Sequence, residues 1–175
     1  TVAWATSDAS VATVSSAGLV TAVADGTATI TAASGSASAT ATVTVSQVAA
    51  TVELSPSSLA FQSLGDTVTL VATVRDAGGT VISGATVTWA TSNSSIATVS
   101  SAGLVTAVAD GTATITATSG SVSATATTTV SQTAASLTLS PTSLSFTSAG
   151  DGATLVATVR DAGGTVISNP TVTWV

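Results

Sequence analysis

The chain has 175 residues, and its formal net charge of −6 comes from eight acidic residues and two arginines, with no lysine or histidine. Because Lys and Arg supply most of the affinity for phosphates, this composition argues against nucleic acid and anionic membrane surfaces as partners. The lack of cysteine excludes a disulfide framework and a thiolate metal site. Polar residues interrupt every apolar run well before the roughly 18 residues of a membrane-spanning helix, so we expect a core and no membrane insertion in this segment.

The sequence is a tandem repeat with a period of 85 residues. Residues 1–46 align with residues 86–131, and residues 47–90 align with residues 132–175, with no gap and with 20 differences in 90 aligned pairs. Tryptophan recurs with the same interval, at Trp4, Trp89 and Trp174. A unit of this size folds as one small domain, so we expect about two repeat units that share one fold.

Within a repeat, apolar and polar residues alternate with a period of two, which predicts half-buried strands. In Thr67–Arg75, for example, Val68, Leu70, Ala72 and Val74 share one face. The other predicted strands of this copy, in chain order, are Val87–Trp89, Ala97–Val99, Thr112–Thr118 and Ser121–Val130. No stretch has the apolar stripe of an amphipathic helix.

Turn sequences separate these strands. Asp-Gly is a strong hairpin signal, because both residues tolerate positive φ, and it occurs at Asp25-Gly26 and Asp110-Gly111. A second hairpin loop is predicted at Arg75–Gly79 and Arg160–Gly164, and further turns at Gly65-Asp66 and Ser119-Gly120. About seven short strands per repeat, separated by such turns, predict an all-β fold made of antiparallel β-sandwiches.

Four stretches in fixed order resemble the bacterial immunoglobulin-like domain, group 2. They are Trp89, Ser92–Val99, Gly103–Ala107 and Gly111–Ala117. The resemblance implies tandem immunoglobulin-like sandwiches. Repeats of that family occur in surface adhesins related to intimin and invasin, in other secreted bacterial proteins and in phage tail proteins. The resemblance therefore also implies an extracellular or cell-surface location.

On this resemblance, residues 46–131 form one complete repeat, which we call the central segment. Residues 1–45, the N-terminal segment, supply the later strands of a preceding repeat, and residues 132–175, the C-terminal segment, supply the earlier strands of a following one. Each flanking segment would expose a core unless neighbouring repeats in the chain, or another chain joined head to tail, complete it. Thr1–Ala5 and Thr171–Val175 both correspond to the same tryptophan strand, and this overlap favours a window from a longer array.

The composition predicts that the protein is not an enzyme. Serine and threonine hydroxyls are abundant, but the usual groups that activate them, His and Lys, are absent. Paired carboxylates for glycoside chemistry would have to face one cleft, whereas here the acids are spread one per turn.

Aspartates in the predicted loops are candidates for calcium, because hard cations take carboxylate and carbonyl oxygens. These are Asp66, Asp76 and Asp110, with the equivalents Asp151, Asp161 and Asp25. Since no dense D-x-D-x-D run exists, turn geometry is the favoured explanation for them. We therefore expect no cofactor, with calcium as the alternative.

The aromatic residues are predicted to be structural. Each tryptophan shares a strand face with a valine, as does the buried tryptophan of immunoglobulin-like sandwiches, which favours a core position over sugar binding. The predicted core aromatics are Trp4, Trp89, Trp174, Phe61 and Phe146.

The leading hypothesis is a structural repeat module of an extracellular bacterial filament, fibre or cell-surface stalk. Its partners would be neighbouring copies or repeats of the same protein. The linker Ser46–Val52 contains no Pro or Gly, which favours a stiff joint. The alternative is an adhesin that recognises a host receptor or glycan through the loop tips Ala77–Thr80 or Ser92–Ser95. A phage-tail location is a third possibility.

Overall fold

The computed structural model describes all residues, 1–175, and contains sixteen strands. The all-β prediction is confirmed. The chain forms no helix, and hence none that is long and apolar enough to cross a membrane. The backbone divides into two compact units, described here separately. Unit 1 comprises Thr1–Ala49 and Arg75–Ile82, and unit 2 comprises Ala50–Val74 and Ser83–Val175.

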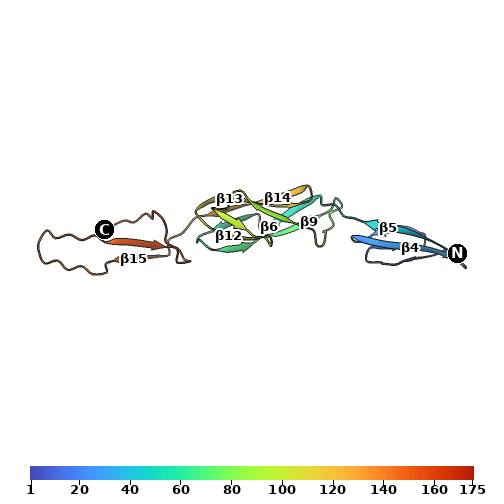
Figure 1. Cartoon of the computed structure of the whole chain (residues 1–175), viewed down its shortest axis with the longest axis horizontal. Helices are drawn as coiled ribbons and strands as arrows, with labels where there is room; N and C mark the ends of the chain where they lie inside the picture. The colour runs from blue at the N-terminus through green and yellow to red at the C-terminus, as the bar shows by residue number, and fades with distance from the viewer. The chain divides into compact units, whose positions relative to one another are not determined.

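Unit 1 contains one antiparallel sheet of three strands and one separate hairpin. The sheet has the order β1-β4-β5 and comprises Ala3–Thr6, Gly26–Ser34 and Ala37–Val45 (Figure 1). The hairpin pairs β2 and β3, which are Ala12–Val14 and Val20–Ala22. Its small core contains Val11, Ala12 and Ala28.

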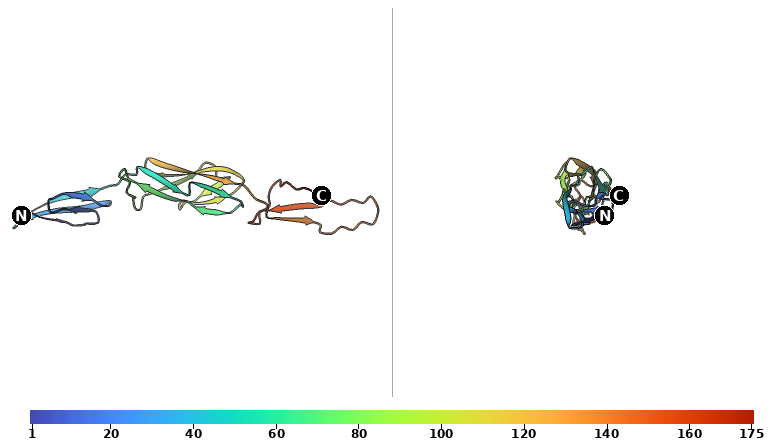
Figure 2. Two further views of the ribbon diagram at one scale, coloured as in Figure 1. Left: turned by 180° about the vertical axis from the view of Figure 1, so that it is seen from behind. Right: turned by 90° about the vertical axis from the view of Figure 1, so that its right-hand side faces the viewer.

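Unit 2 contains the two main sheets of a sandwich. The first has the order β10-β13-β14-β7 and comprises Thr88–Thr91, Gly111–Ser119, Val122–Val130 and Ser58–Phe61. The second has the order β11-β12-β8 and comprises Ala97–Val99, Leu104–Ala107 and Thr67–Thr69. A third pair joins β6 (Thr51–Ser55) to β9 (Val71–Arg75), whose last residue belongs to unit 1 (Figures 1 and 2).

The core of unit 2 receives side chains from both main sheets. Its buried members are Leu59, Phe61, Leu70, Ala97, Val105, Ala107, Ala113, Ile115, Ala126 and Val130. One pairing differs from the predicted antiparallel arrangement, because β14 and β7 run parallel, with Val130 opposite Phe61. This pairing joins an early strand of the sandwich to its last one.

The predicted strand Thr67–Arg75 is in fact two strands. Leu70 separates β8, which extends the β11-β12 sheet, from β9, which pairs with β6. The Leu70 side chain is buried in the core, and its amide donates to the carbonyl of Gly103 at 2.9 Å. The chain thus changes sheets while its apolar alternation continues, so the sequence pattern could not reveal the break.

The Asp-Gly prediction is also corrected. Asp110-Gly111 connects β12 to β13, which lie in different sheets, so it is not a hairpin turn. Glycine is required there because φ is 141° and a Cβ would lie 2.7 Å from Ile96 Cδ1. The predicted turn at Ser119-Gly120 is confirmed, because Ser119 pairs with Val122 across a two-residue hairpin.

In the C-terminal segment, only one pair of strands forms. It joins β15 (Ser136–Ser140) to β16 (Val156–Arg160), and long loops surround it in Figure 1. Residues 143–146 and 152–154, which correspond to β7 and β8, lie outside strands. A strand persists only when its backbone groups find partners, and these segments have no adjoining sheet edge in the structure.

Candidate functional site: the linker glutamines and loop aspartates

In unit 2, the linker residue Gln132 binds two carboxylates. Its backbone amide donates to Asp110 Oδ1 at 2.8 Å, and its side-chain Nε2 donates to Asp161 Oδ2 at 2.9 Å. Asp110 lies in the connection before β13, and Asp161 directly follows β16. Residues from three parts of the chain are therefore connected through one glutamine.

Asp161 is the most enclosed carboxylate of this group, with 2% of its surface exposed. Besides Gln132, it accepts hydrogen bonds from the amides of Leu64, at 3.0 Å, and Thr165, at 2.8 Å. The hydrogen bond from Gln132 is the main cause that lowers the pKa of Asp161, and burial opposes it; the amides of Leu64 and Thr165 lower the pKa further. The carboxylate is therefore ionised at neutral pH.

Unit 1 repeats this arrangement 85 residues earlier. Gln47 Nε2 donates to Asp76 Oδ2 at 2.9 Å, and the Gln47 amide donates to Asp25 Oδ1. Asp76 also accepts from the amides of Gly78 and Thr80, and it is only partly buried. The hydrogen bond from Gln47 is the largest cause that lowers the pKa of Asp76. The same contact thus occurs in both units.

Each loop that carries the second aspartate is closed by its own backbone. In the loop after β16, Gly164 donates its amide to the Asp161 carbonyl at 3.0 Å, and the Asp161 amide donates to Thr165. Arg160 Nη1 donates to the Gly164 carbonyl at 2.8 Å, and Arg75 makes the equivalent bond to Gly79. The loop therefore presents its carboxylate in a fixed position.

Two of the three calcium candidates lie beside linker residues, and the third does not. Asp76 and Asp110 accept hydrogen bonds from linker glutamines, whereas Asp66 uses its backbone carbonyl to bind the amide of Ala107. No three acidic, His or Cys side chains form a group that could hold a metal ion. N–H donors point at the carboxylates of Asp76 and Asp110, which is the environment of a hydrogen-bond acceptor.

Sequence reasoning missed Gln47 and Gln132. A weak signal existed, because each glutamine follows an Asp-Gly aspartate by 22 residues and is identical in the two linkers, while neighbouring positions such as Val48 and Thr133 differ. Nothing in the local pattern pointed to the aspartate 29 residues further along the chain.

The predicted core aromatics fall into two groups. Phe61 is buried, and Trp89 packs against the same core while partly exposed. Trp4, Phe146 and Trp174 are exposed, so the expected core position is not found for these three. All three lie in the flanking segments, where Trp4 belongs to β1 and Phe146 and Trp174 lie outside strands.

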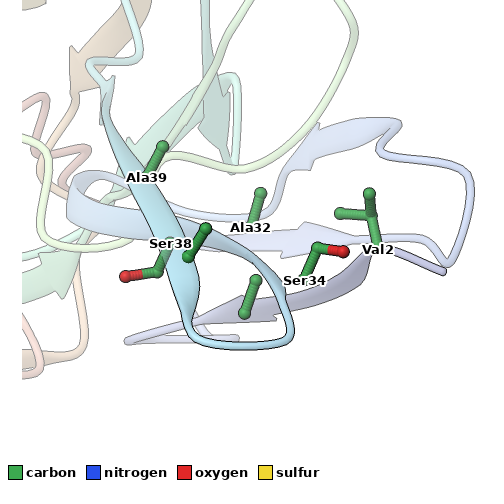
Figure 3. A pocket seen from close by; sticks show the side chains of 7 residues that line it. Val2, Ala32, Ser34, Ser38 and Ala39 are labelled. Carbon is green, nitrogen blue, oxygen red and sulfur yellow. The ribbon is translucent and has the colours of Figure 1, made fainter.

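The sheet of unit 1 has an open hollow of about 230 Å³ at the β4–β5 hairpin. In Figure 3 the side chains of Val2, Ala32 and Ala39 project to the same side of the strands. Ala117 and Ser119 of unit 2, the equivalents of Ala32 and Ser34, are buried. Part of the hollow therefore corresponds to the inner face of the sandwich. Its lining residues are Val2, Ala32, Ala33, Ser34, Ala37, Ser38 and Ala39.

The family model of the bacterial Ig-like domain (group 2) matches residues 1–45 and 48–130. The chain belongs to this family. Both copies of the repeat contribute to the match. Gln47 lies between the two matched segments, and Gln132 lies two residues after the second. No curated protein matches the chain in sequence.

Solved structures with a similar fold include those of bacterial surface proteins. The S-layer protein SbsC is 22% identical over 95% of this bacterial Ig-like chain and 24% of its own, with a TM-score of 0.47. InvD of Yersinia pseudotuberculosis is 19% identical over 95% of this chain and 61% of its own, with a TM-score of 0.42. The Yersinia adhesin InvE is 21% identical over 50% and 28%, with a TM-score of 0.34. The chain thus spans about a quarter of the SbsC structure.

Proposed function

We propose that this chain is a structural repeat module of an extracellular bacterial filament, fibre or cell-surface stalk, with Ig-like sandwiches joined end to end. Residues 46–131 form the complete repeat, and residues 1–45 and 132–175 are parts of its neighbours. The module is not an enzyme, since neither His nor Lys is present to activate its hydroxyls. Family membership and the tandem sequence support this proposal.

The recurring contact between a linker glutamine and a loop aspartate carries the proposal. The Gln47–Asp76 and Gln132–Asp161 distances are both 2.9 Å, although the two contacts lie in different units. In each case a second aspartate holds the backbone of the same glutamine. Because the side chain and the backbone amide of the linker glutamine are both hydrogen-bonded, bending at the linker between repeats is restrained, as a spacer requires.

The strand before each linker belongs to a long antiparallel ladder. β14 forms nine residue pairs with β13 before the chain reaches Gln132, and β5 forms nine with β4 before Gln47. Tension that enters through a linker is therefore transmitted to a long ladder and to the core beneath it. Lys–Asn isopeptide bonds cannot reinforce this module, because the chain has no lysine.

Electron microscopy of native material that contains this chain tests the proposal. Strands of about eight residues at roughly 3.3 Å per residue, together with loops, give a repeat of about 40 Å per domain along a fibre or stalk. Fibres with this spacing are the expected result. Isolated particles in the same material, without any periodic fibre, would contradict the structural role.

The alternative is recognition of a host receptor or glycan through loop tips. Ala77–Thr80 belongs to the loop whose aspartate binds Gln47, so a joint already engages this loop. At the other tip, Asn93 accepts hydrogen bonds from Ser95 within the loop itself. Neither loop offers an observation that favours a ligand, and we retain the structural role.

A further inference from the structure

The chain contains only two bonds that a protease specific for arginine or lysine can cut. These are the bonds Arg75–Asp76 and Arg160–Asp161, since the sequence has two arginines and no lysine. They are 85 residues apart, and each joins the end of a strand, β9 or β16, to the loop whose aspartate binds a linker glutamine. Each repeat thus places its basic residue beside the linker contact.

Exposure alone does not protect these two bonds. Arg160 is exposed and Arg75 is partly exposed, so a protease can reach both residues. Trypsin-like enzymes bind the arginine side chain through a carboxylate in a pocket, attack its carbonyl carbon with a serine hydroxyl, and hold its carbonyl oxygen with N–H donors. The arginine side chain and the backbone on both sides of the bond must therefore be free to enter the active site of the enzyme.

Three groups that such an enzyme needs at Arg160 are already hydrogen-bonded. The Arg160 carbonyl accepts from the Ala135 amide at 2.8 Å, and the Asp161 amide donates to the Thr165 carbonyl at 2.9 Å. The side chain is also engaged, since Arg160 Nη1 donates to the Gly164 carbonyl at 2.8 Å. All three hydrogen bonds have to break before the bond can be hydrolysed.

The residue after this bond is fixed by the linker contact. The Asp161 side chain is 2% exposed, and it accepts from Gln132 Nε2 at 2.9 Å and from the Leu64 amide at 3.0 Å. Because the bond lies between a paired strand and this fixed aspartate, it can extend into an active site only after Asp161 has left Gln132 and Leu64.

Unit 1 has the same arrangement at Arg75. The Asp76 amide donates to the Thr80 carbonyl at 2.9 Å, and Arg75 Nη1 donates to the Gly79 carbonyl at 3.0 Å. The side chain of Asp76 accepts from Gln47 Nε2 at 2.9 Å. In both units a glutamine therefore fixes the residue that follows the bond.

We propose that the contact between linker glutamine and loop aspartate protects the chain against trypsin-like proteases, which hydrolyse Arg75–Asp76 or Arg160–Asp161 only after that contact has opened. Hydrolysis adds a water molecule across the C–N bond, leaves a carboxylate on the arginine and an amino group on the aspartate, and uses the catalytic groups of the protease. The inference goes beyond the structural role, because it rests on the contacts at the two arginines and not on fibre formation.

Limited digestion of the full chain with trypsin at neutral pH tests this proposal. The variants Gln47→Ala and Gln132→Ala are made separately, and cleavage at each bond is followed with time by mass spectrometry. Because the chain has no other arginine or lysine, every tryptic fragment reports one of the two bonds. Each variant therefore contains the other bond as its matched control. Peptides with the sequences of residues 70–81 and 155–166 measure how fast trypsin cuts each sequence without the linker contact.

When opening is fast relative to cleavage, the cleavage rate follows the population of the open form. Loss of one hydrogen bond should raise this population about fivefold. Gln47→Ala should therefore accelerate cleavage at Arg75 alone, and Gln132→Ala should accelerate cleavage at Arg160 alone. Both peptides should be cut faster than the same bonds in the natural chain.

Three outcomes would overturn the proposal. Unchanged rates in both variants would show that the glutamines do not protect the bonds. Equal acceleration of both bonds by either single substitution would assign the effect to general unfolding. Peptides that are cut no faster than the natural chain would assign the resistance to the local sequence.

The two proposals fail separately. Periodic fibres in native material together with unchanged cleavage rates would retain the structural role and exclude protection by the glutamines. Selective acceleration at the expected bonds without any native fibre would retain the protection and exclude the fibre role.

Discussion

Among the glycines, Gly103 has the closest neighbouring atom to an added Cβ. Its φ is +80°, and an added Cβ would lie 2.5 Å from the Leu70 carbonyl oxygen, at the point where the chain passes between sheets. Side chains in this conformation cost about 1–2 kcal/mol, and overpacking adds about 1–3 kcal/mol. Gly103→Ala should therefore lower the free energy of unfolding by about 2–5 kcal/mol in urea denaturation.

A matched control for this prediction is Gly65→Ala. Gly65 has a similar φ of +84°, but nothing lies within 4 Å of its added Cβ. It should lose only the conformational part, about 1–2 kcal/mol. Equal losses for the two variants would show that the close approach to Leu70 is not what requires Gly103.

Thr128 carries a buried hydroxyl without a partner. The residue is fully buried, and its Oγ1 makes no hydrogen bond. The equivalent residue in the first copy is Val43, which has the same branched shape and no polar atom. Because an unpaired buried hydroxyl costs about 1–3 kcal/mol, Thr128→Val should raise the free energy of unfolding by up to that amount. An unchanged or lower urea midpoint would contradict this expectation.

Among the structural elements, the loop that carries Asp161 should respond to pH. The pKa of Asp161 is lowered from its ordinary value of 3.8. The hydrogen bonds that the ionised carboxylate accepts therefore stabilise the folded loop fully above pH 3.8. This stabilisation is lost as the pH falls through the lowered pKa. Amide hydrogen exchange at Leu64, which donates to Asp161, should therefore show protection that declines in acid.

Asp161→Asn isolates this effect from the other acidic groups. At neutral pH at least one of the Leu64 and Thr165 amides should exchange faster in the variant, because the two amides donate to different oxygens of Asp161 and asparagine replaces one of these oxygens by an NH₂ group that cannot accept. The difference between variant and natural chain should shrink as the pH falls. A difference that is constant with pH would mean that the charge of Asp161 does not hold the joint.

The strands could be predicted from the sequence to a large extent, because alternation and turn residues act locally. β13, β14 and their hairpin at Gly120 follow from Thr-rich alternation and one glycine. The exchange of sheets at Leu70 could not be predicted, since either sheet accepts the same alternation. The Gln132–Asp161 contact depends on where a loop 29 residues later returns in space, and no local propensity encodes that.

For the whole molecule, the linker glutamines should limit bending. Substituting Gln47→Ala together with Gln132→Ala removes both side-chain contacts to Asp76 and Asp161. Pulsed electron–electron spin resonance between labels at the exposed residues Ser38 and Thr142 should then show a broader distance distribution. Gln62→Ala is the control, because Gln62 is exposed and its side chain bonds to neither aspartate. Equal widths in both variants would assign joint stiffness to the backbone alone.

The parallel pairing of β7 with β14 affects how a sandwich would resist pulling. β7 lies near the first linker and β14 leads into the second, and four residue pairs join them, from Ser58–Thr127 to Phe61–Val130. A force that draws the two linkers apart slides these parallel strands along each other and strains all their hydrogen bonds at once. An antiparallel pair held at one end would instead open one bond at a time, like a zipper. The strand order therefore places a shear contact between the points where force enters and leaves the central segment.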